Sequence, residues 1–294
     1  MDRIDSKTRI AALFGNPVAH SLSPLFMNES LARLRVNCVY LAVCVEEEHL
    51  GGAIEAIRAV GMAGVNVTIP FKRACMRYLD TIDENAARIG AVNCIEVRGS
   101  SLTGHNTDCT GFLAPIDKTG VTLDGAYALV AGAGGAARAV VYGLLESGVG
   151  RVLLANRTPG SALRLVEWAE DLPFSGKTEY IGDASRVTQK LVNETAIVVN
   201  TTPVGQHPHV NESPFPGGIH FKPGQIVYDL VYNPRETRLL ASAKADGAFP
   251  MDGLRMLVSQ GMESLGIWFP DRRDAIGNLS DFCLTLLSDK TKVV

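Results

Sequence analysis

Short apolar runs rich in β-branched residues alternate along the chain with segments in which apolar residues recur at helical spacing. The predicted strands are residues 9–15, 38–45, 64–70, 91–97, 127–133, 151–156, 196–202 and 226–232. Helices are predicted to open at Ser23-Pro24 and to cover residues 46–60 and 135–147. Because parallel strands are buried on both faces and are joined by helices, this alternation predicts an α/β fold with mainly parallel sheets.

The length of the chain, 294 residues, is typical of two domains. The stretch R-G-S-S at residues 98–101 predicts a turn, and therefore one antiparallel hairpin in the first half. A new strand-glycine-helix unit begins after residues 108–125. We expect the boundary between the domains in that segment.

Composition predicts a globular protein with a full apolar core. The chain is 46% hydrophobic and 20% charged, with a formal net charge of -3, which argues against a nucleic-acid or membrane surface. The six cysteines form no C-x-x-C pair and are expected to be reduced thiols, mostly in the core. The charged start M-D-R-I-D-S-K-T-R-I predicts a cytoplasmic location. We expect no metal, because His207 and His209 form an isolated pair in a proline-rich loop.

The stretch A-G-A-G-G-A-A-R-A at residues 131–139 fits the pattern G-x-G-x-x-G/A after an apolar strand and before a helix. Gly132 permits a tight turn, and Gly134 lets the backbone approach a pyrophosphate. The helix N-terminus adds unpaired N–H groups and a positive dipole end. This context predicts a Rossmann dinucleotide site, against the alternative of a merely tight strand-helix turn.

The residues after the next strand indicate which dinucleotide binds. NAD enzymes carry an acidic residue there for the ribose 2′-hydroxyl, whereas this chain carries Asn156, Arg157 and Thr158. Because a guanidinium pairs with a 2′-phosphate, Arg157 favours NADP. The alternative is that Arg157 is an ordinary surface arginine.

Lys72 follows the apolar strand G-V-N-V-T-I-P directly. If the next element is a helix, its first turn presents a positive dipole end to the ammonium, at a cost of roughly 0.3 to 1 kcal/mol. This unfavourable position favours a role for Lys72 in proton transfer. A flexible lysine that points into water is the alternative.

Asp108 closes the motif N-T-D just before another predicted helix. As a helix N-cap it has a simple structural explanation. A capping carboxylate can also share a hydrogen bond with an ammonium and a substrate hydroxyl, so the two roles remain compatible.

The segment H-S-L-S-P at residues 20–24 follows the first strand. Ser23 and Pro24 are explained as an N-cap and first helical residue, but Ser21 is not. Because residues two apart in an extended segment face the same side, we expect both serine hydroxyls to hold one carboxylate.

A set of motifs in order resembles the shikimate dehydrogenase family over about residues 13–270. The motifs are H-S-L-S-P, G-x-N-V-T-I-P-F-K, G-A-V-N, N-T-D-x-x-G, G-A-G-G-A, N-R-T, N-T-T-P-x-G and D-G-L-x-M-L-V-x-Q-G. The resemblance implies an NADP-dependent, reversible reduction of 3-dehydroshikimate to shikimate in aromatic amino-acid biosynthesis. It also implies that helices from about residue 253 return to the first domain. The expected domains are then residues 1–108 with about 255–294 for substrate binding and catalysis, and residues 109–254 for NADP.

The resemblance assigns roles to individual residues. Lys72 is expected to transfer the proton with the help of Asp108. The expected substrate-binding residues, in addition to Asp108, are Ser21, Ser23, Thr68, Asn93, Tyr232 and Gln260. The expected cofactor-binding residues are Gly132, Ala133, Gly134, Gly135, Ala136, Asn156, Arg157, Thr158, Leu230 and Gly253. The expected state of the chain is a monomer or homodimer.

Three positions depart from the usual family pattern. Met27 stands where many relatives have histidine, and Arg255 stands where a small or neutral residue is more usual. After Thr158 the chain lacks the further basic residue of some NADP-preferring relatives, which weakens the NADP prediction. A quinate or dual quinate/shikimate dehydrogenase using NAD(P) is therefore an alternative. A non-catalytic NADP-binding regulator is a remote alternative. Such a protein has no need of Lys72 or Asp108, and this chain has both.

Overall fold

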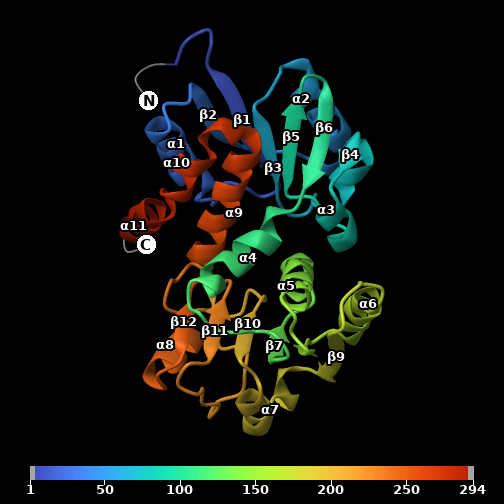
Figure 1. Cartoon of the computed structure of the whole chain (residues 1–294), viewed down its shortest axis with the longest axis vertical. Coiled ribbons are helices and arrows are strands. Elements are labelled where there is room, and N and C mark those ends of the chain that lie inside the picture. The colour runs from blue at the N-terminus through green and yellow to red at the C-terminus, as the bar shows by residue number, and fades with distance from the viewer. Residues whose placement is uncertain (1–3, 291–294) are drawn as a thin grey trace. The chain divides into compact units, whose positions relative to one another are not determined.

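The structure is a computed structural model that describes residues 4–290, with side chains to residue 288. The start of the charged N-terminal segment and the last residues of the predicted C-terminal return lie outside the described residues. The chain divides into two compact units, one of residues up to Gly111 together with those from Leu257 on, the other of residues Phe112–Met256. Figure 1 shows the elements of both.

The first unit is built on a mixed sheet with the strand order β2-β1-β3-β5-β6-β4. Its strands are β1 (Arg9–Gly15), β2 (Cys38–Cys44), β3 (Gly64–Val67), β4 (Thr81–Ile82), β5 (Cys94–Arg98) and β6 (Ser101–His105). Its helices are α1 (Ser23–Arg33), α2 (Leu50–Ala59), α3 (Glu84–Ile89), α10 (Arg273–Gly277) and α11 (Ser280–Lys290). Two further helices, α4 (Thr107–Asp117) and α9 (Gly253–Trp268), continue across the unit boundaries.

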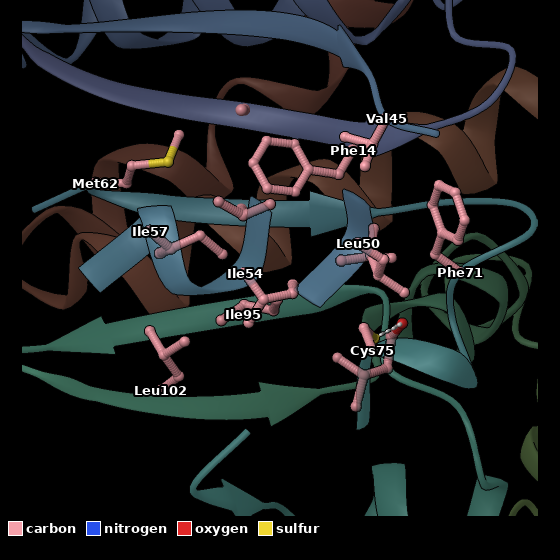
Figure 2. Close-up of a cluster of buried hydrophobic side chains, with 14 of the residues drawn as sticks. Phe14, Val45, Leu50, Ile54, Ile57, Met62, Phe71, Cys75, Ile95 and Leu102 are labelled. Atoms are coloured by element: carbon pink, nitrogen blue, oxygen red, sulfur yellow. Dashed lines mark hydrogen bonds between the residues drawn. The ribbon is translucent and has the colours of Figure 1, made fainter. Parts of the chain in front are cut away.

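Helices cover both faces of this sheet. Alternate residues of β3 point to opposite sides and therefore contact different helices. Val65 and Val67 belong to a buried cluster with Leu50, Ile54 and Ile57 of α2, as Figure 2 shows for the α2 residues. On the other face, Gly64 lies against the Trp268 ring of α9, so close that a Cβ at position 64 would lie 2.3 Å from it. Asn66, two residues on, donates to Ser264 of α9. The polar positions of β3 therefore face α9.

The second unit holds an all-parallel sheet in the order β12-β11-β10-β7-β8-β9. Its strands are β7 (Tyr127–Ala131), β8 (Arg151–Ala155), β9 (Lys177–Gly182), β10 (Ile197–Asn200), β11 (Ile226–Asp229) and β12 (Phe249–Met251). Its remaining helices are α5 (Gly135–Glu146), α6 (Pro159–Glu170), α7 (Gln189–Glu194) and α8 (Arg238–Ala245). This is the doubly wound nucleotide-binding order, in which successive strands are added outward from β7 on one side and from β10 on the other.

The fold class predicted from sequence is confirmed, including the hairpin, which is formed by antiparallel β5 and β6. Several strands are shorter than predicted because side chains or turns take over their backbone groups. The run at residues 91–97 becomes a strand only from Cys94, since Val92 N–H donates to Lys72 O instead. The run at residues 196–202 ends at Asn200, whose side chain binds the following turn. The polar edge strand β9 was not predicted, because it lacks an apolar run.

Candidate functional site

One edge of the first sheet collects most of the predicted substrate residues. β1, β3 and β6 run in the same direction, while β5 runs against them. The segments that follow β1, β3 and β6 carry Ser21, Lys72 and Asp108 in turn. Asn93 comes just before β5, whose start lies at this same edge. Strand direction therefore brings together residues that are far apart in the sequence.

Lys72 is held by the residues on either side of it. Phe71 is 1% exposed and packs into the apolar cluster of Figure 2, and Lys72 O accepts from Val92 N–H at 2.7 Å. Lys72 lies in the turn before a 3₁₀ helix that starts at Ala74, and not in the first turn of a helix. The helix-dipole cost expected for Lys72 from the sequence therefore does not arise. The buried Phe71 ring and the hydrogen bond from Val92 N–H together hold the Lys72 backbone.

The Lys72 ammonium is paired with the Asp108 carboxylate. Lys72 Nζ lies 2.5 Å from Asp108 Oδ2, and the two side chains are 23% and 10% exposed. Asn93 Nδ2 donates to the other carboxylate oxygen, Asp108 Oδ1, at 2.9 Å. Both carboxylate oxygens are thus bonded, and the ammonium stays partly open to solvent.

Asp108 is not the N-cap of α4, contrary to the structural alternative raised from the sequence. Asn106 fills that place, because its Oδ1 accepts from the backbone N–H of Asp108 at 3.1 Å and of Cys109 at 3.4 Å. Asp108 sits in the first turn, where a negative charge is favourable. Its carboxylate is consequently available for Lys72.

A buried polar network supports the pair from behind. Asn93 exchanges hydrogen bonds with Thr107, accepting from its backbone N–H at 2.7 Å and donating to its Oγ1 at 3.0 Å. Thr107 Oγ1 lies 3.2 Å from Ser264 Oγ on α9, which also accepts from Asn66 Nδ2 at 2.9 Å. All four residues are at most 5% exposed. Sequence reasoning missed Asn66, Thr107 and Ser264, although G-x-N-V-T and N-T-D contain two of them.

The serine pair is arranged differently from the prediction. Helix α1 starts at Ser23 with Leu22 as N-cap, and Leu22 has helical angles. The segment is therefore not extended, and Ser23 is not the cap. Instead Ser21 Oγ accepts from the Ser23 N–H at 3.2 Å, so Ser21 itself satisfies an N-terminal amide of α1. Both serines remain beside the N-terminus of that helix.

Thr68 and Gln260 are placed by close backbone packing. Thr68 directly follows β3, and its methyl group would clash with a Cβ at Gly15, 2.3 Å away. Gln260 of α9 lies against Gly111, where a Cβ would come within 2.8 Å of the Gln260 backbone nitrogen. Gly111 lies one helical turn after Asp108, which explains the glycine of N-T-D-x-x-G. Gln260 is therefore held next to the α4 turn that carries Asp108.

The glycine loop of the second unit has the local geometry expected of a pyrophosphate cradle. Gly132 directly follows β7 with φ of +108°, and a Cβ there would lie 2.3 Å from Thr201 Oγ1. Gly134 and Gly135 are exposed, and a Cβ on either would meet no other group within 4 Å. Ala133 and Ala136 are half-buried on either side. Helix α5 starts at Gly135 without an acidic residue in its first turn, which suits an anion.

A cavity of about 580 Å³ lies at the carboxyl edge of the second sheet. It is lined by Ala131, Ala155, Asn156, Arg157, Thr158, Asp183, Ala184, Ser185, Thr202, Pro203, Val204, Glu212, Ser213 and Pro214. The predicted residues Asn156, Arg157 and Thr158 thus share one cavity. A dinucleotide fits here by its chemistry, because open glycine backbone and an exposed guanidinium face the same edge.

The cavity lining also includes residues that the sequence reasoning missed. Asp183 and Ser185 follow the unpredicted strand β9, and the Asp183 carboxylate accepts from the Ser185 N–H at 2.9 Å. Hydrogen bonds from the Ser185 hydroxyl and from the Ser185 backbone N–H lower the pKa of Asp183. Thr202 belongs to the N-T-T-P-x-G motif, so a signal for it was present. Arg164 Nη2 reaches back to Ser161 Oγ at 3.3 Å, so a basic group does approach the start of α6.

Leu230, Gly253 and Tyr232 lie near the ends of β11 and β12. A Cβ at Gly253 would lie 2.1 Å from Leu230 O, and Gly253 N–H donates to Val231 O at 3.1 Å. The two residues assigned to the nicotinamide end are therefore neighbours. Burial raises the pKa of the Tyr232 phenol.

Met27 and Arg255, which the sequence analysis found to be unusual, have different surroundings. Met27 is 0% exposed, and its Sδ would lie 3.3 Å from a Cβ at Gly261 of α9, so it is a core residue. Arg255 is exposed on the first turn of α9. Nothing in the structure explains the arginine at that position.

Between residues 4 and 290, no three His, Cys, Asp or Glu side chains gather as metal ligands would. Within the same range, no helix combines the length and apolar character needed to cross a bilayer. The cysteines are free thiols, and all but Cys44 are buried.

Comparison with known proteins places these observations in a family. Residues 13–95 match the family described as shikimate dehydrogenase substrate binding domain. A curated relative, shikimate dehydrogenase (NADP(+)) of Moorella thermoacetica, is 43% identical over 269 residues, covering 91% of this chain and 90% of its own length.

Solved structures extend the likeness to the whole fold. Shikimate 5-dehydrogenase of Listeria monocytogenes, in complex with shikimate and NAD, has a TM-score of 0.87 at 32% identity, with 95% of this chain and 98% of that chain covered. Quinate dehydrogenase of Corynebacterium glutamicum, in complex with NAD, has a TM-score of 0.85 at 25% identity, covering 95% and 99%. With this coverage and identity, and with the motifs at the sheet edges where the fold requires them, the chain belongs to the shikimate dehydrogenase family.

Proposed function

We propose that this chain catalyses the reversible, NADP-dependent reduction of 3-dehydroshikimate to shikimate. The observation that carries the proposal is the bond between Lys72 Nζ and Asp108 Oδ2 at 2.5 Å. It places a partly exposed ammonium at the edge where the polar residues of the first unit gather. The curated relative at 43% identity supports the substrate and the cofactor.

Lys72 acts as the proton donor in the direction of ketone reduction. Negative charge grows on the substrate oxygen as the carbonyl is reduced, and an ammonium nearby both stabilises and protonates that oxygen. Asp108 and Asn93 orient this ammonium, since Asn93 fixes one carboxylate oxygen and the other faces Lys72. In the reverse direction the neutral amine accepts the proton of the hydroxyl group.

The substrate carboxylate is bound by Ser21 and Ser23 beside the N-terminus of α1, where N–H groups and the helix dipole favour an anion. The ring hydroxyls are bound by the polar residues of the same edge together with Tyr232. Those of the first unit are Thr68, Asn93, Asp108 and Gln260. Several directed partners give strong discrimination, because an analogue that lacks one hydroxyl leaves a buried polar group unpaired.

NADP would be held by the residues around the glycine loop and the cavity, and its reduced form would supply the hydride for ketone reduction. The loop from Gly132 to Ala136 holds the pyrophosphate, with Ala133, Gly134 and Gly135 offering backbone N–H groups. Asn156, Arg157 and Thr158 bind the adenosine phosphate, and Arg157 supplies the positive charge. Leu230 and Gly253 contact the nicotinamide end.

Initial rates measured with shikimate and quinate, each with NADP and NAD, test the proposal. We expect the highest kcat/KM for shikimate with NADP. Turnover of quinate alone, with NAD, would overturn the assignment. The specific observation behind that alternative is the likeness to a quinate dehydrogenase, at the lower identity of 25%. Absence of turnover with all four pairs, together with NADP binding, would favour the regulator.

We also infer a cytoplasmic monomer or homodimer. Small-metabolite chemistry at both edges requires no macromolecular partner and no membrane surface. Light scattering during size-exclusion chromatography measures the mass, and a tetramer would contradict the inference.

A further inference from the structure

Asp229 is a buried acid in the second unit to which the proposed chemistry gives no role. It ends β11 and is 0% exposed, yet its carboxylate is fully bonded. Oδ1 accepts from Asn200 Nδ2 at 2.9 Å and from the Val231 N–H at 3.1 Å. Oδ2 accepts from Thr237 Oγ1 at 2.7 Å. Burying a carboxylate costs free energy, and the three hydrogen bonds offset part of that cost. The position of these bonds indicates what Asp229 holds together.

The bonds to Oδ1 join two loops at the carboxyl edge of the sheet. The Asn200 side chain shapes the first loop. Asn200 Oδ1 accepts from the N–H and the hydroxyl of Thr202, and Asn200 Nδ2 donates to Val204 O at 3.1 Å. Thr202 and Val204 line the cavity. The second loop begins with Leu230 and Val231, and Leu230 N–H donates to Asn200 O at 2.9 Å. The Asn200 and Asp229 side chains therefore connect the cavity wall to the loop that holds Leu230.

We propose that Asp229 is a positioning residue for cofactor binding, whose carboxylate ties loop 200–204, in the wall of the NADP cavity, to loop 230–232, at the proposed nicotinamide end. This inference rests on the proposed function for the identity of the cofactor. Asp229 itself touches neither cofactor nor substrate. It acts by holding both loops in one arrangement before NADP arrives, which lowers the ordering cost of binding.

The ionisation of Asp229 controls the strength of these ties. Burial raises its pKa to about 6, against the opposing effect of its hydrogen bonds to Thr237, Val231 and Asn200. The groups that bond to it from β10, from the following loop and from the start of α8 are a side-chain amide, a backbone amide and a hydroxyl, and none carries a charge. Because the pKa is raised in this arrangement, the ties are most stable with the protonated acid and lose stability as the pH rises through about 6.

Asp229→Asn reproduces the protonated acid. The amide oxygen can accept from Asn200 and Val231 as Oδ1 does, while the NH₂ group can donate to Thr237 Oγ1 as a carboxylic O–H would. The variant keeps the shape of the network and loses only the charge. Any difference from the wild-type chain should therefore depend on pH.

The test measures the Kd of NADP by titration, without substrate, for wild type and Asp229→Asn between pH 5 and 8. Because the variant lacks the buried charge that weakens the ties, we expect it to bind NADP about tenfold more tightly than wild type at pH 8, and the ratio of the two Kd values to approach one at pH 5. Titration of the NADP 2′-phosphate cancels in this ratio. A ratio of one throughout, or a ratio that does not change with pH, would overturn the proposal.

Gln225→Met, just before the start of the same strand, provides a matched control. Gln225 is 3% exposed at the opposite end of β11, where Nε2 donates to Val192 O and Thr195 O at 2.8 and 2.9 Å. This variant should lower Tm and leave the Kd of NADP within twofold of wild type. An equal change in the Kd of NADP in both variants would overturn the positioning role.

A measurement on the wild-type chain covers the case in which Asp229→Asn does not fold. Protection of the Val231 amide against hydrogen exchange, corrected for the intrinsic rate at each pH, should rise as the pH drops through about 6, because opening hydrates a carboxyl whose pKa is raised in the closed state. Constant protection would contradict the proposal. Wild-type oxidation of shikimate with NADP judges the proposed function separately, and failure of the wild-type chain to bind NADP would overturn both.

Discussion

The carboxyl edges of the two sheets use the chain in opposite ways. The edge of the first unit is made of side chains, with Lys72 and Asp108 paired above a buried network that reaches Ser264. The edge of the second unit is made largely of exposed backbone, with Gly134 and Gly135 opening α5. A chemical step requires a titratable group at one position, whereas a pyrophosphate requires N–H groups and room. Substitutions should therefore lower kcat in the first unit and affect cofactor binding in the second.

Among these substitutions, Lys72→Ala should have the largest effect, a fall in kcat. We expect kcat to fall by about 10²- to 10⁴-fold, because a general acid of this kind contributes that much, while the Kd of NADP stays within twofold. Steady-state rates and a cofactor titration measure the two quantities. Lys118→Ala, at an exposed lysine on another segment, is the control and should behave as wild type. Near-normal turnover in Lys72→Ala would remove the assigned role.

Gly132→Ala and Gly134→Ala separate strain from ligand approach within the glycine loop. At position 132, the positive φ and the Thr201 hydroxyl 2.3 Å from the new Cβ should lower stability by about 1 to 3 kcal/mol. At position 134, φ is -90° and the space is open, so stability should hold while NADP binding weakens. Thermal unfolding and NADP titration measure both effects. Equal stability of the two variants would contradict this account.

Arg157→Gln should reduce the preference for NADP. Loss of a charge-assisted bond to the 2′-phosphate costs about 1.5 to 3 kcal/mol, so kcat/KM for NADP should fall roughly tenfold or more. The value for NAD should remain nearly unchanged, since NAD lacks that phosphate. A parallel fall for both cofactors would mean that Arg157 supports the loop and does not select the cofactor.

His105 gives the smallest expected effect and tests the charged character of the first unit. Its Nδ1 lies 2.8 Å from Asp83 Oδ2, and its Nε2 lies 3.3 Å from Glu96 Oε2. Burial works against the protonated ring, but bonds to Asp83 and Glu96 outweigh it and raise the pKa of His105. A raised pKa means that the stabilisation is complete below the unfolded-state value of about 6.5 and is lost as pH rises through the folded-state pKa.

The partner carboxyl sets the lower limit of this pH window. The pKa of Asp83 is lowered by His105 and by backbone N–H groups despite burial, so its contribution is present above its ordinary value and lost at lower pH. His105→Gln should therefore lower the free energy of unfolding by about 1 kcal/mol at pH 5.5, and by less at pH 9. Urea unfolding at both values checks this. A loss that is the same at both would show that packing, and not charge, is involved.

Local chemistry explains what could be predicted at the second edge. The glycine spacing, the apolar strand before it and the absence of an acid after β8 lie within a few residues of one another, and they predicted the loop and Arg157. The cavity adds Asp183 and Ser185, which follow a polar edge strand that carries no apolar signal.

The first edge was predicted only in part. The sequence supplied Lys72 and Asp108, but it gave the wrong local reasons for both, a helix dipole for the lysine and an N-cap for the acid. Asn106 caps α4, and Phe71 anchors Lys72. A short-range pattern predicts that a polar residue caps a helix. It does not decide which of two neighbouring polar residues is the cap, as Asn106 and Asp108 show.

The sequence by itself determined the α/β alternation, the glycine turn and the order of the motifs, because each depends on residues adjacent in the chain. The tertiary structure alone decided that Lys72 meets Asp108, 36 residues away, and that Thr107 meets Ser264, 157 residues away. It also decided that Asn200 meets Asp229. Such contacts depend on strand order and direction, which place distant strand ends at one edge, and no local pattern of polarity encodes that order.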